Sequence, residues 1–281
     1  MDINKIYCES NLETMKRMGD NFIDLTVTSP PYDGLRDYNG YSFPFEEIAK
    51  ELYRITKEGG VVVWVVGDAT IKGSETGTSF KQALFFKECG FNLHDTMIYQ
   101  RTSPFPSNIR YNQSFEYMFV FSKGKPKTFN PVIKQRKTDE SIKRAKTKTY
   151  SSNTYRDKEG NLNTPNKQAL KRLNDARNNN YILADNIWYI PAGYGLSTTD
   201  KEAFKHPAIF PEDLVSKHII SWSNEGDLIY DCFMGSGTTA KMAHIHKRNW
   251  IGSEMSKEYV EIANNRLKPY LTQLDIFDAG A

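Results

Sequence analysis

A chain of 281 residues, 39% of them hydrophobic and with a formal net charge of +3, is long enough for one large α/β domain with an inserted subdomain. Its three cysteines, Cys8, Cys89 and Cys232, lie far apart without a C-x-x-C pair, so we expect neither a metal site nor a disulfide framework. No signal peptide and no apolar run of membrane-spanning length is visible, which predicts a cytoplasmic protein without a membrane partner.

The first predicted elements lead to a proline turn. The pattern indicates a strand at 3–7, a helix at 12–18 and a strand at 23–27, which ends at Thr28-Ser29-Pro30-Pro31-Tyr32. Two prolines continue neither a strand ladder nor a helix, so the chain must leave the sheet here in a stiff, extended turn. Residues 29–32 then offer a hydroxyl, carbonyls with no internal partner and a flat ring. Alone, the motif is more typical of an ordinary proline turn with a surface tyrosine.

Helices and strands alternate in the next part of the chain. Residues 45–56 place apolar side chains on one helical face, and Gly59-Gly60 is expected to end that helix. The unbroken apolar run at 61–66 is typical of a parallel strand buried on both faces. Asp68 follows it and would either border a ligand site or cap a helix. Further on, the pattern predicts a helix at 79–89 and strands at 94–99 and 115–121.

The positive charge is concentrated in the middle of the chain. Residues 123–180 carry sixteen lysines and arginines against five acidic residues, a net charge of +11, so the remainder sums to −8. Such basic, polar tracts are often solvated linkers that do not fold alone. The alternative is a DNA-contacting insertion, with cations on phosphates and the interleaved Tyr150, Asn153 and Tyr155 available for base edges.

Regular patterns resume at 186–190 and lead to a glycine turn. A short apolar run at 227–230 precedes Asp231-Cys232-Phe233-Met234-Gly235-Ser236-Gly237-Thr238-Thr239, and a helical pattern follows. In a strand, glycine turn and helix, backbone N–H groups and a helix N-terminus face a nucleotide-like ligand. Glu254 stands about 20 residues after the glycines, where such folds grip ribose hydroxyls. An amphipathic helix at 256–271 is the last predicted element.

The glycine turn is not specific by itself. No Gly-Lys-Ser/Thr ends it, which argues against a phosphate loop, and no third glycine follows, which argues against an NAD site. An ordinary strand-to-helix turn of a parallel-sheet protein is about as consistent with so short a match.

Together the two motifs resemble the amino-methylating DNA methyltransferases that use S-adenosylmethionine. The Ser-Pro-Pro-Tyr form is similar to the cytosine-N4 branch, whereas Asp or Asn in place of Ser29 is more usual for adenine-N6. The catalytic motif precedes the cofactor loop, as in that family's beta group. The runs 34–38 (Gly-Leu-Arg-Asp-Tyr), 116–117 (Glu-Tyr) and 206–207 (His-Pro) extend the resemblance along most of the chain. Cys232 departs from it, because the family commonly has proline there.

The resemblance implies catalytic roles for Ser29, Pro30, Pro31 and Tyr32. The Ser29 hydroxyl and the Pro30 carbonyl would accept the N–H groups of the target amine, and Tyr32 would stack on a base flipped out of the duplex. It also implies cofactor contacts by Asp231, Phe233, Gly235, Ser236, Gly237, Thr238, Glu254 and His206. Asp231 would receive the methionine ammonium, Glu254 the ribose hydroxyls, and His206 would lie beside the methionine end.

We therefore predict an α/β, Rossmann-like methyltransferase fold with S-adenosylmethionine as cofactor: a mostly parallel sheet, helices on both faces and an inserted DNA-recognition region. Residues 1–124 would form the catalytic half, 125–185 the basic target-recognition insertion and 186–281 the cofactor-binding half. The predicted activity is methylation of N4 of a cytosine in double-stranded DNA. Adenine-N6 methylation and a non-catalytic DNA-binding homologue are the alternatives. A homodimer and a separately acting restriction endonuclease stay open as partners.

Overall fold

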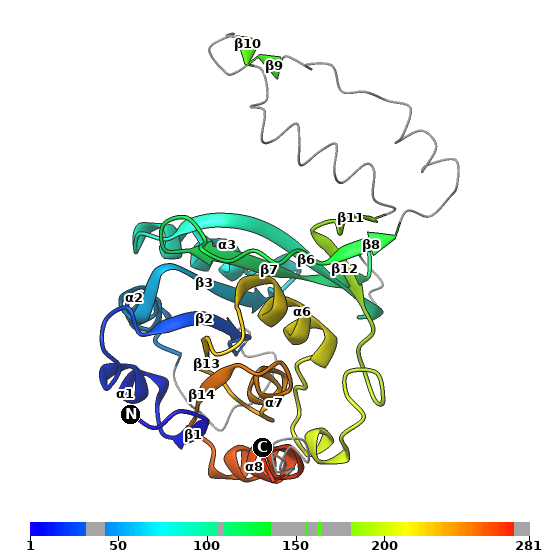
Figure 1. Cartoon of the computed structure of the whole chain (residues 1–281). Coiled ribbons are helices and arrows are strands. Elements are labelled where there is room, and N and C mark those ends of the chain that lie inside the picture. The colour runs from blue at the N-terminus through cyan, green and yellow to red at the C-terminus, as the bar shows by residue number, and fades with distance from the viewer. Residues whose placement is uncertain (32–42, 106–109, 136–154, 157–161, 164–180, 273–281) are drawn as a thin grey trace. The chain divides into compact units, whose positions relative to one another are not determined.

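The computed structural model describes residues 1–31, 43–105, 110–135, 155–156, 162–163 and 181–272 (Figure 1). The chain forms two compact units: Met1–Asn130 together with Asn186–Ala281, and Pro131–Asp185. The second unit lies within the segment 125–185, whose role as a target-recognition insertion stays a prediction. Its described parts are two short antiparallel pairs: β8 (Ile133–Gln135) with β11 (Tyr181–Leu183), and β9 (Tyr155–Arg156) with β10 (Leu162–Asn163).

A sheet of eight strands forms the centre of the first unit, in the order β1-β14-β13-β2-β3-β7-β6-β12. Their bounds are β1 Lys5–Cys8, β14 Asn249–Glu254, β13 Leu228–Asp231, β2 Ile23–Thr28, β3 Thr56–Val66, β7 Gln113–Ser122, β6 Asn92–Phe105 and β12 Ile187–Ile190. All neighbours are parallel except β7, which is antiparallel to both β3 and β6. The predicted, mostly parallel sheet is confirmed. The reversal of β7 was not predicted, and it arises because β6 and β7 form a hairpin.

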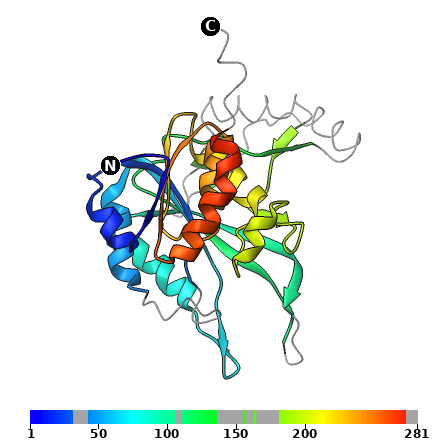
Figure 2. The same ribbon diagram turned by 90° about the horizontal axis from the view of Figure 1, so that it is seen from below.

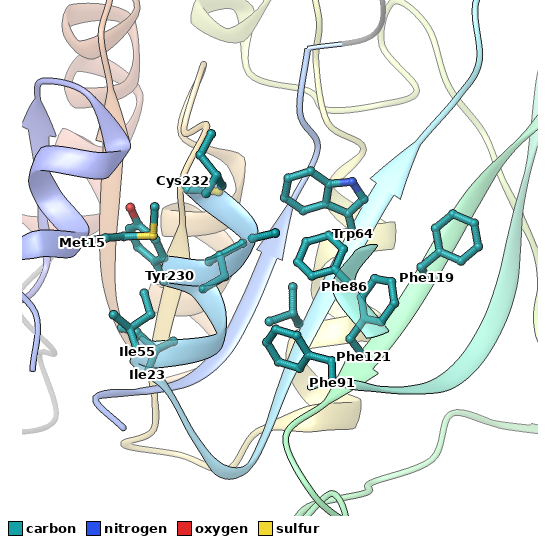
Figure 3. Packing of buried hydrophobic residues seen from close by; sticks show 14 of the residues in the cluster. Met15, Ile23, Ile55, Trp64, Phe86, Phe91, Phe119, Phe121, Tyr230 and Cys232 are labelled. Carbon is teal, nitrogen blue, oxygen red and sulfur yellow. The ribbon is translucent and has the colours of Figure 1, made fainter. Parts of the chain in front are cut away.

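Helices cover both faces of this sheet, as predicted (Figures 1 and 2). One face carries α1 (Asn11–Lys16), α2 (Phe45–Ile55) and α3 (Thr78–Glu88); the other carries α6 (Glu212–Trp222), α7 (Thr238–Ile245) and α8 (Lys257–Leu271). In β3, Val62, Trp64 and Val66 pack in one cluster with the first three helices (Figure 3). The alternate residues Val61 and Val63 are equally buried, because α6 packs against β2 and β3 on the opposite face.

The Gly59-Gly60 pair corrects one expectation. It does not end α2, because that helix stops at Ile55 and both glycines lie inside β3. A Cβ on Gly60 would stand 2.8 Å from the Lys57 carbonyl oxygen and 3.0 Å from that of Asp24, and Gly59 has a φ of +75°. These glycines therefore allow backbone segments to approach closely where β3 enters the sheet.

The parallel strands β1, β14, β13, β2 and β3 all end at the same edge of the sheet, which we call the carboxyl edge. Ligands of open α/β sheets bind at this edge. Both motifs singled out in the sequence follow strands that end here, the proline turn after β2 and the glycine turn after β13. Among the described residues, no helix has the length and apolar character needed to cross a membrane.

Candidate active site

Two strand ends that are far apart in the sequence meet at the carboxyl edge. β13 lies beside β2, with Tyr230 opposite Thr26. The Thr28 hydroxyl donates to Asp231 Oδ1 at 2.6 Å, across 203 positions of the chain. Residues 29–31 and the turn at 232–237 therefore leave the sheet from adjacent positions. Ser29 and Pro31 are half-buried and Pro30 is buried, whereas Tyr32 lies outside the described residues.

Asp231 joins the two strand ends to the helix that follows. It is 2% exposed. Besides Thr28, its Oδ1 accepts the Phe233 N–H at 3.0 Å, and its Oδ2 accepts the Thr239 hydroxyl at 2.6 Å. Burial raises the pKa of Asp231, while these hydrogen bonds oppose the rise. The carboxylate thus has an evident structural role, and its predicted contact with the methionine ammonium stays a prediction.

The glycine turn requires its glycines. Gly235 and Gly237 have φ of +49° and +80°. A Cβ on Gly237 would lie 2.9 Å from Ala263 Cβ, and one on Gly235 would lie 3.1 Å from His206 Nε2. The turn passes directly into α7, whose N-terminus has no side-chain cap. Its first N–H groups and the positive end of the helix dipole suit the carboxylate of an amino-acid moiety.

Glu254 holds the glycine turn against the end of β14. Its Oε2 accepts the Gly235 N–H and its Oε1 accepts the Ser256 N–H, each at 2.9 Å. The side chain remains partly exposed. Burial raises the pKa of Glu254, and the backbone hydrogen bonds counteract this. Each carboxylate oxygen can accept more than one bond, so Glu254 can still accept from a ligand hydroxyl while it holds the turn; its predicted contact with the ribose hydroxyls stays a prediction.

His206 packs against the same turn. It is 7% exposed, and its ring meets that of Tyr259 edge-on at 4.2 Å. Its Nδ1 lies 2.6 Å from the Ala208 carbonyl oxygen and 3.1 Å from the Ala208 nitrogen. The ring is therefore held beside Gly235, and its predicted place at the methionine end of the cofactor stays a prediction.

Arg266 supports the glycine turn through hydrogen bonds from α8. It was not singled out from the sequence alone. Its side chain is fully buried on α8. Nη1 donates to the Ser236 carbonyl at 3.1 Å and to the Thr238 hydroxyl at 2.8 Å. Nε donates to Asp200 at 2.9 Å, and Nη2 donates to Glu212. A signal was present, since Arg266 lies one turn after Ile262 on the inward face of a predicted amphipathic helix.

Lys241 completes a group of four charges, in which the two cations are buried and the two carboxylates are half-buried. It donates to Asp200 at 2.6 Å and to Glu212 at 2.8 Å. Burial acts to raise the pKa of Asp200, but hydrogen bonds from Lys241 and Arg266 hold that pKa below its usual value. Two cations and two carboxylates thus form a neutral cluster that links the glycine turn to the segment 200–212.

Asp68 and Cys232, both noted in the sequence, make structural contacts. Asp68 anchors the start of α3, because it accepts the Ser79 N–H at 2.8 Å and the Ser79 hydroxyl at 2.5 Å. Cys232, buried, lies 3.7 Å from the Thr28 hydroxyl, and Asn11 donates to its carbonyl at 3.1 Å. Within the described part of the chain, no cluster of three or more His, Cys, Asp or Glu side chains could hold a metal ion.

Known DNA-methylating proteins match this chain along most of its length. The sequence pattern of the N6/N4 DNA methylases matches residues 23–265. The chain is 60% identical over 257 residues to the orphan methyltransferase M.BamHII of Bacillus amyloliquefaciens, covering 91% of this chain and 92% of that protein. It is 27% identical to the type II methyltransferase M1.MboII of Moraxella bovis, covering 94% and 96% of the two chains.

Solved structures of methyltransferases share the fold. The PvuII DNA methyltransferase, described as cytosine-N4-specific, aligns with a TM-score of 0.65 at 21% identity, over 97% of this chain and 87% of that one. M1.HpyAVI in complex with S-adenosylmethionine aligns with a TM-score of 0.58 at 25% identity, over 94% and 98%. Both matches extend over nearly the whole of the present chain.

Proposed function

Because this chain belongs to the N6/N4 family of DNA methylases, we propose that it methylates N4 of a cytosine turned out of duplex DNA. S-adenosylmethionine is the cofactor of this methyltransferase family. The observation that supports the proposal is the hydrogen bond between Thr28 and Asp231, which joins the strand ends before the proline turn and the glycine turn. The serine at position 29 and the likeness to a cytosine-N4-specific structure favour cytosine.

Ser29 and Pro30 would orient the amine. S-adenosylmethionine supplies a methyl group already activated by its sulfonium, so the enzyme's main task is to align the nucleophile with it. A base amine is a poor nucleophile, because its lone pair is delocalised into the ring. The Ser29 hydroxyl and the Pro30 carbonyl can accept its two N–H bonds. These contacts favour a tetrahedral nitrogen and stabilise the positive charge that develops there.

Each predicted cofactor residue suits a different part of S-adenosylmethionine. Gly235, Ser236, Gly237 and Thr238 would line the methionine and ribose with backbone groups, with Phe233 and His206 as walls. Glu254 would accept hydrogen bonds from the ribose hydroxyls, and Asp231 would attract the ammonium. The +11 segment at 123–180 would supply phosphate contacts to DNA.

Nucleoside analysis of DNA methylated by the protein tests the proposal. We expect N4-methylcytosine. N6-methyladenine without N4-methylcytosine would overturn the cytosine assignment and favour the adenine alternative. No transfer of tritiated methyl to DNA would favour the non-catalytic homologue. Mapping the modified positions at base resolution would then identify the recognition site.

Ser29→Ala tests the role of the hydroxyl, with Ser216→Ala as a matched control. Both serines are half-buried, and Ser216 lies on α6, where it bonds with His246 at 2.6 Å. We expect Ser29→Ala to lower kcat by about tenfold to a hundredfold at an unchanged KM for S-adenosylmethionine, as for the loss of one transition-state hydrogen bond. A Ser29→Ala enzyme as active as its parent would remove that role.

A further inference from the structure

A small hairpin leaves the carboxyl edge directly after β3. β4 (Thr70–Ile71) pairs antiparallel with β5 (Ser74–Glu75), and Lys72 and Gly73 form the connection. Both central residues have positive φ, +49° for Lys72 and +83° for Gly73. Two such residues are typical of the tight type I′ turn, whose twist matches that of its strands. The hairpin is therefore an ordered projection from the edge that carries the site.

This hairpin is anchored at its base and braced along its length. The Thr76 N–H donates to the Ala69 carbonyl at 2.9 Å and closes the base. Arg110, from the connection between β6 and β7, donates to the Gly73 carbonyl at 2.6 Å and to the Thr70 hydroxyl at 3.2 Å. It also pairs with Glu75 at 3.6 Å. Figure 2 shows both hairpins extending from the same side of the sheet, with β4–β5 in cyan and β6–β7 in green.

The tip of the hairpin presents an apolar side chain beside a cation. Ile71 is 55% exposed, and the neighbouring Lys72 is exposed too. An apolar side chain held at the end of a braced projection suits insertion between stacked planar groups, and the lysine suits a phosphate. DNA, the substrate of this family, combines the two chemistries.

The position of the hairpin relative to the proline turn supports the same partner. β3 lies beside β2 with Trp64 opposite Thr28. The hairpin thus rises from the strand next to the one that delivers Ser29. A target base held at Ser29 has left its stack, and the gap remains in the DNA next to the protein.

We propose that the β4–β5 hairpin is a wedge that enters DNA at the step from which the target base departs. Ile71 fills the opened step and keeps the base from returning, and Lys72 binds an adjacent phosphate. Arg110 is a positioning residue that holds the wedge. The inference rests on the proposed function, since methylation of a base amine within a duplex requires the base to leave the stack.

Ile71→Ala tests the wedge, with Ile245→Ala as the matched control. Ile245 is 45% exposed at the end of α7, at the edge opposite the glycine turn. Single-turnover methylation is measured on duplexes carrying the mapped site, with the target base either paired or opposite an abasic position. We expect Ile71→Ala to be about tenfold slower on the paired duplex and close to its parent on the abasic one, because the latter base is already unpaired. Ile245→Ala should match its parent on both.

Equal rates for Ile71→Ala and its parent on the paired duplex would overturn the wedge. So would an equal loss on both duplexes, which would indicate damage to the catalytic site. Failure of the proposed function appears differently, as absent DNA methylation by the unaltered protein. If the methylated base is adenine, the same comparison applies to that base.

Lys72→Asn tests the phosphate contact, with Lys247→Asn as control. Both lysines are exposed and have positive φ, +49° and +59°, which asparagine tolerates. In a plot of the logarithm of the DNA-binding constant against the logarithm of the salt concentration, the slope should become shallower by about one unit in Lys72→Asn and stay unchanged in Lys247→Asn. Identical slopes for Lys72→Asn and the parent would remove the phosphate contact.

Discussion

Substitutions at Arg266 test whether this side chain supports the glycine turn without taking part in the reaction. Arg266→Met leaves Asp200 and Glu212 with Lys241 as the only remaining cation of the cluster, so one half-buried carboxylate loses its charge partner. Breaking a buried ion pair by removing one partner costs about 3–5 kcal/mol. The lost bonds to Ser236 and Thr238 add to this. Because the Asp200 and Glu212 side chains are 21% and 22% exposed, we expect a decrease in the free energy of unfolding toward the lower end of that range.

Urea unfolding and calorimetric titration of S-adenosylmethionine measure the two consequences. Arg266→Lys keeps the charge but not the planar fork that reaches both the carboxylates and the turn. It should therefore lose less stability than Arg266→Met and still bind the cofactor more weakly, with a raised KM at an unchanged kcat. Lys205→Met is the control, because its pair with Glu202 is exposed and contributes at most about 1 kcal/mol.

A second substitution sharpens the test. Adding Glu212→Gln to Arg266→Met restores the charge balance of the cluster, so stability should recover in part while cofactor affinity stays low. An Arg266→Met protein within about 1 kcal/mol of its parent would refute the reasoning on buried charge. Normal cofactor affinity in Arg266→Lys would refute the support of the turn.

His218, Gly237 and Asp231 each support a separate prediction. Burial lowers the pKa of His218 from 6.5 to about 3. As the pH falls, the unfolded chain therefore protonates this histidine before the folded protein does. We expect His218 to lower the free energy of unfolding by about 2 kcal/mol between about pH 7.5 and 5. His218→Leu should flatten that part of the plot of unfolding free energy against pH. A variant whose plot runs parallel to that of the parent would contradict this role of His218. Gly237→Ala should abolish cofactor binding, because the new Cβ would collide with Ala263. Gly77→Ala is the control: Gly77 also has a positive φ, but open space surrounds it, so this variant should still bind the cofactor. Equal cofactor affinities for the two variants in calorimetric titration would count against the close packing at Gly237. Asp231→Asn should keep most of the stability, because its amide oxygen can still accept from Thr28 and Phe233 while its amide nitrogen donates to the Thr239 hydroxyl. It should weaken cofactor binding through loss of the predicted ammonium contact, and an unchanged affinity would remove that contact.

Much of the architecture was readable from local patterns. The apolar run at 61–66, the amphipathic face at 45–56 and the strand before Asp231 predicted elements that the structure confirms to within a few residues. The two motifs and the spacing to Glu254 were also readable, because glycine and proline restrict the backbone wherever they occur. The basic segment at 123–180 was evident from composition, but its role in DNA recognition stays a prediction.

Only the tertiary structure decided which strands are neighbours. β13 lies between β2 and β14, and this order unites Thr28 with Asp231 over 203 positions. Local propensity carries no information on such pairing, which is why the partners of Asp231 and the burial of Arg266 escaped prediction. The same holds for Gly59-Gly60, where the close approach of the Asp24 backbone, and not a helix end, explains the glycines. A residue's type and spacing suggest its chemistry, whereas its partners depend on how distant segments pack.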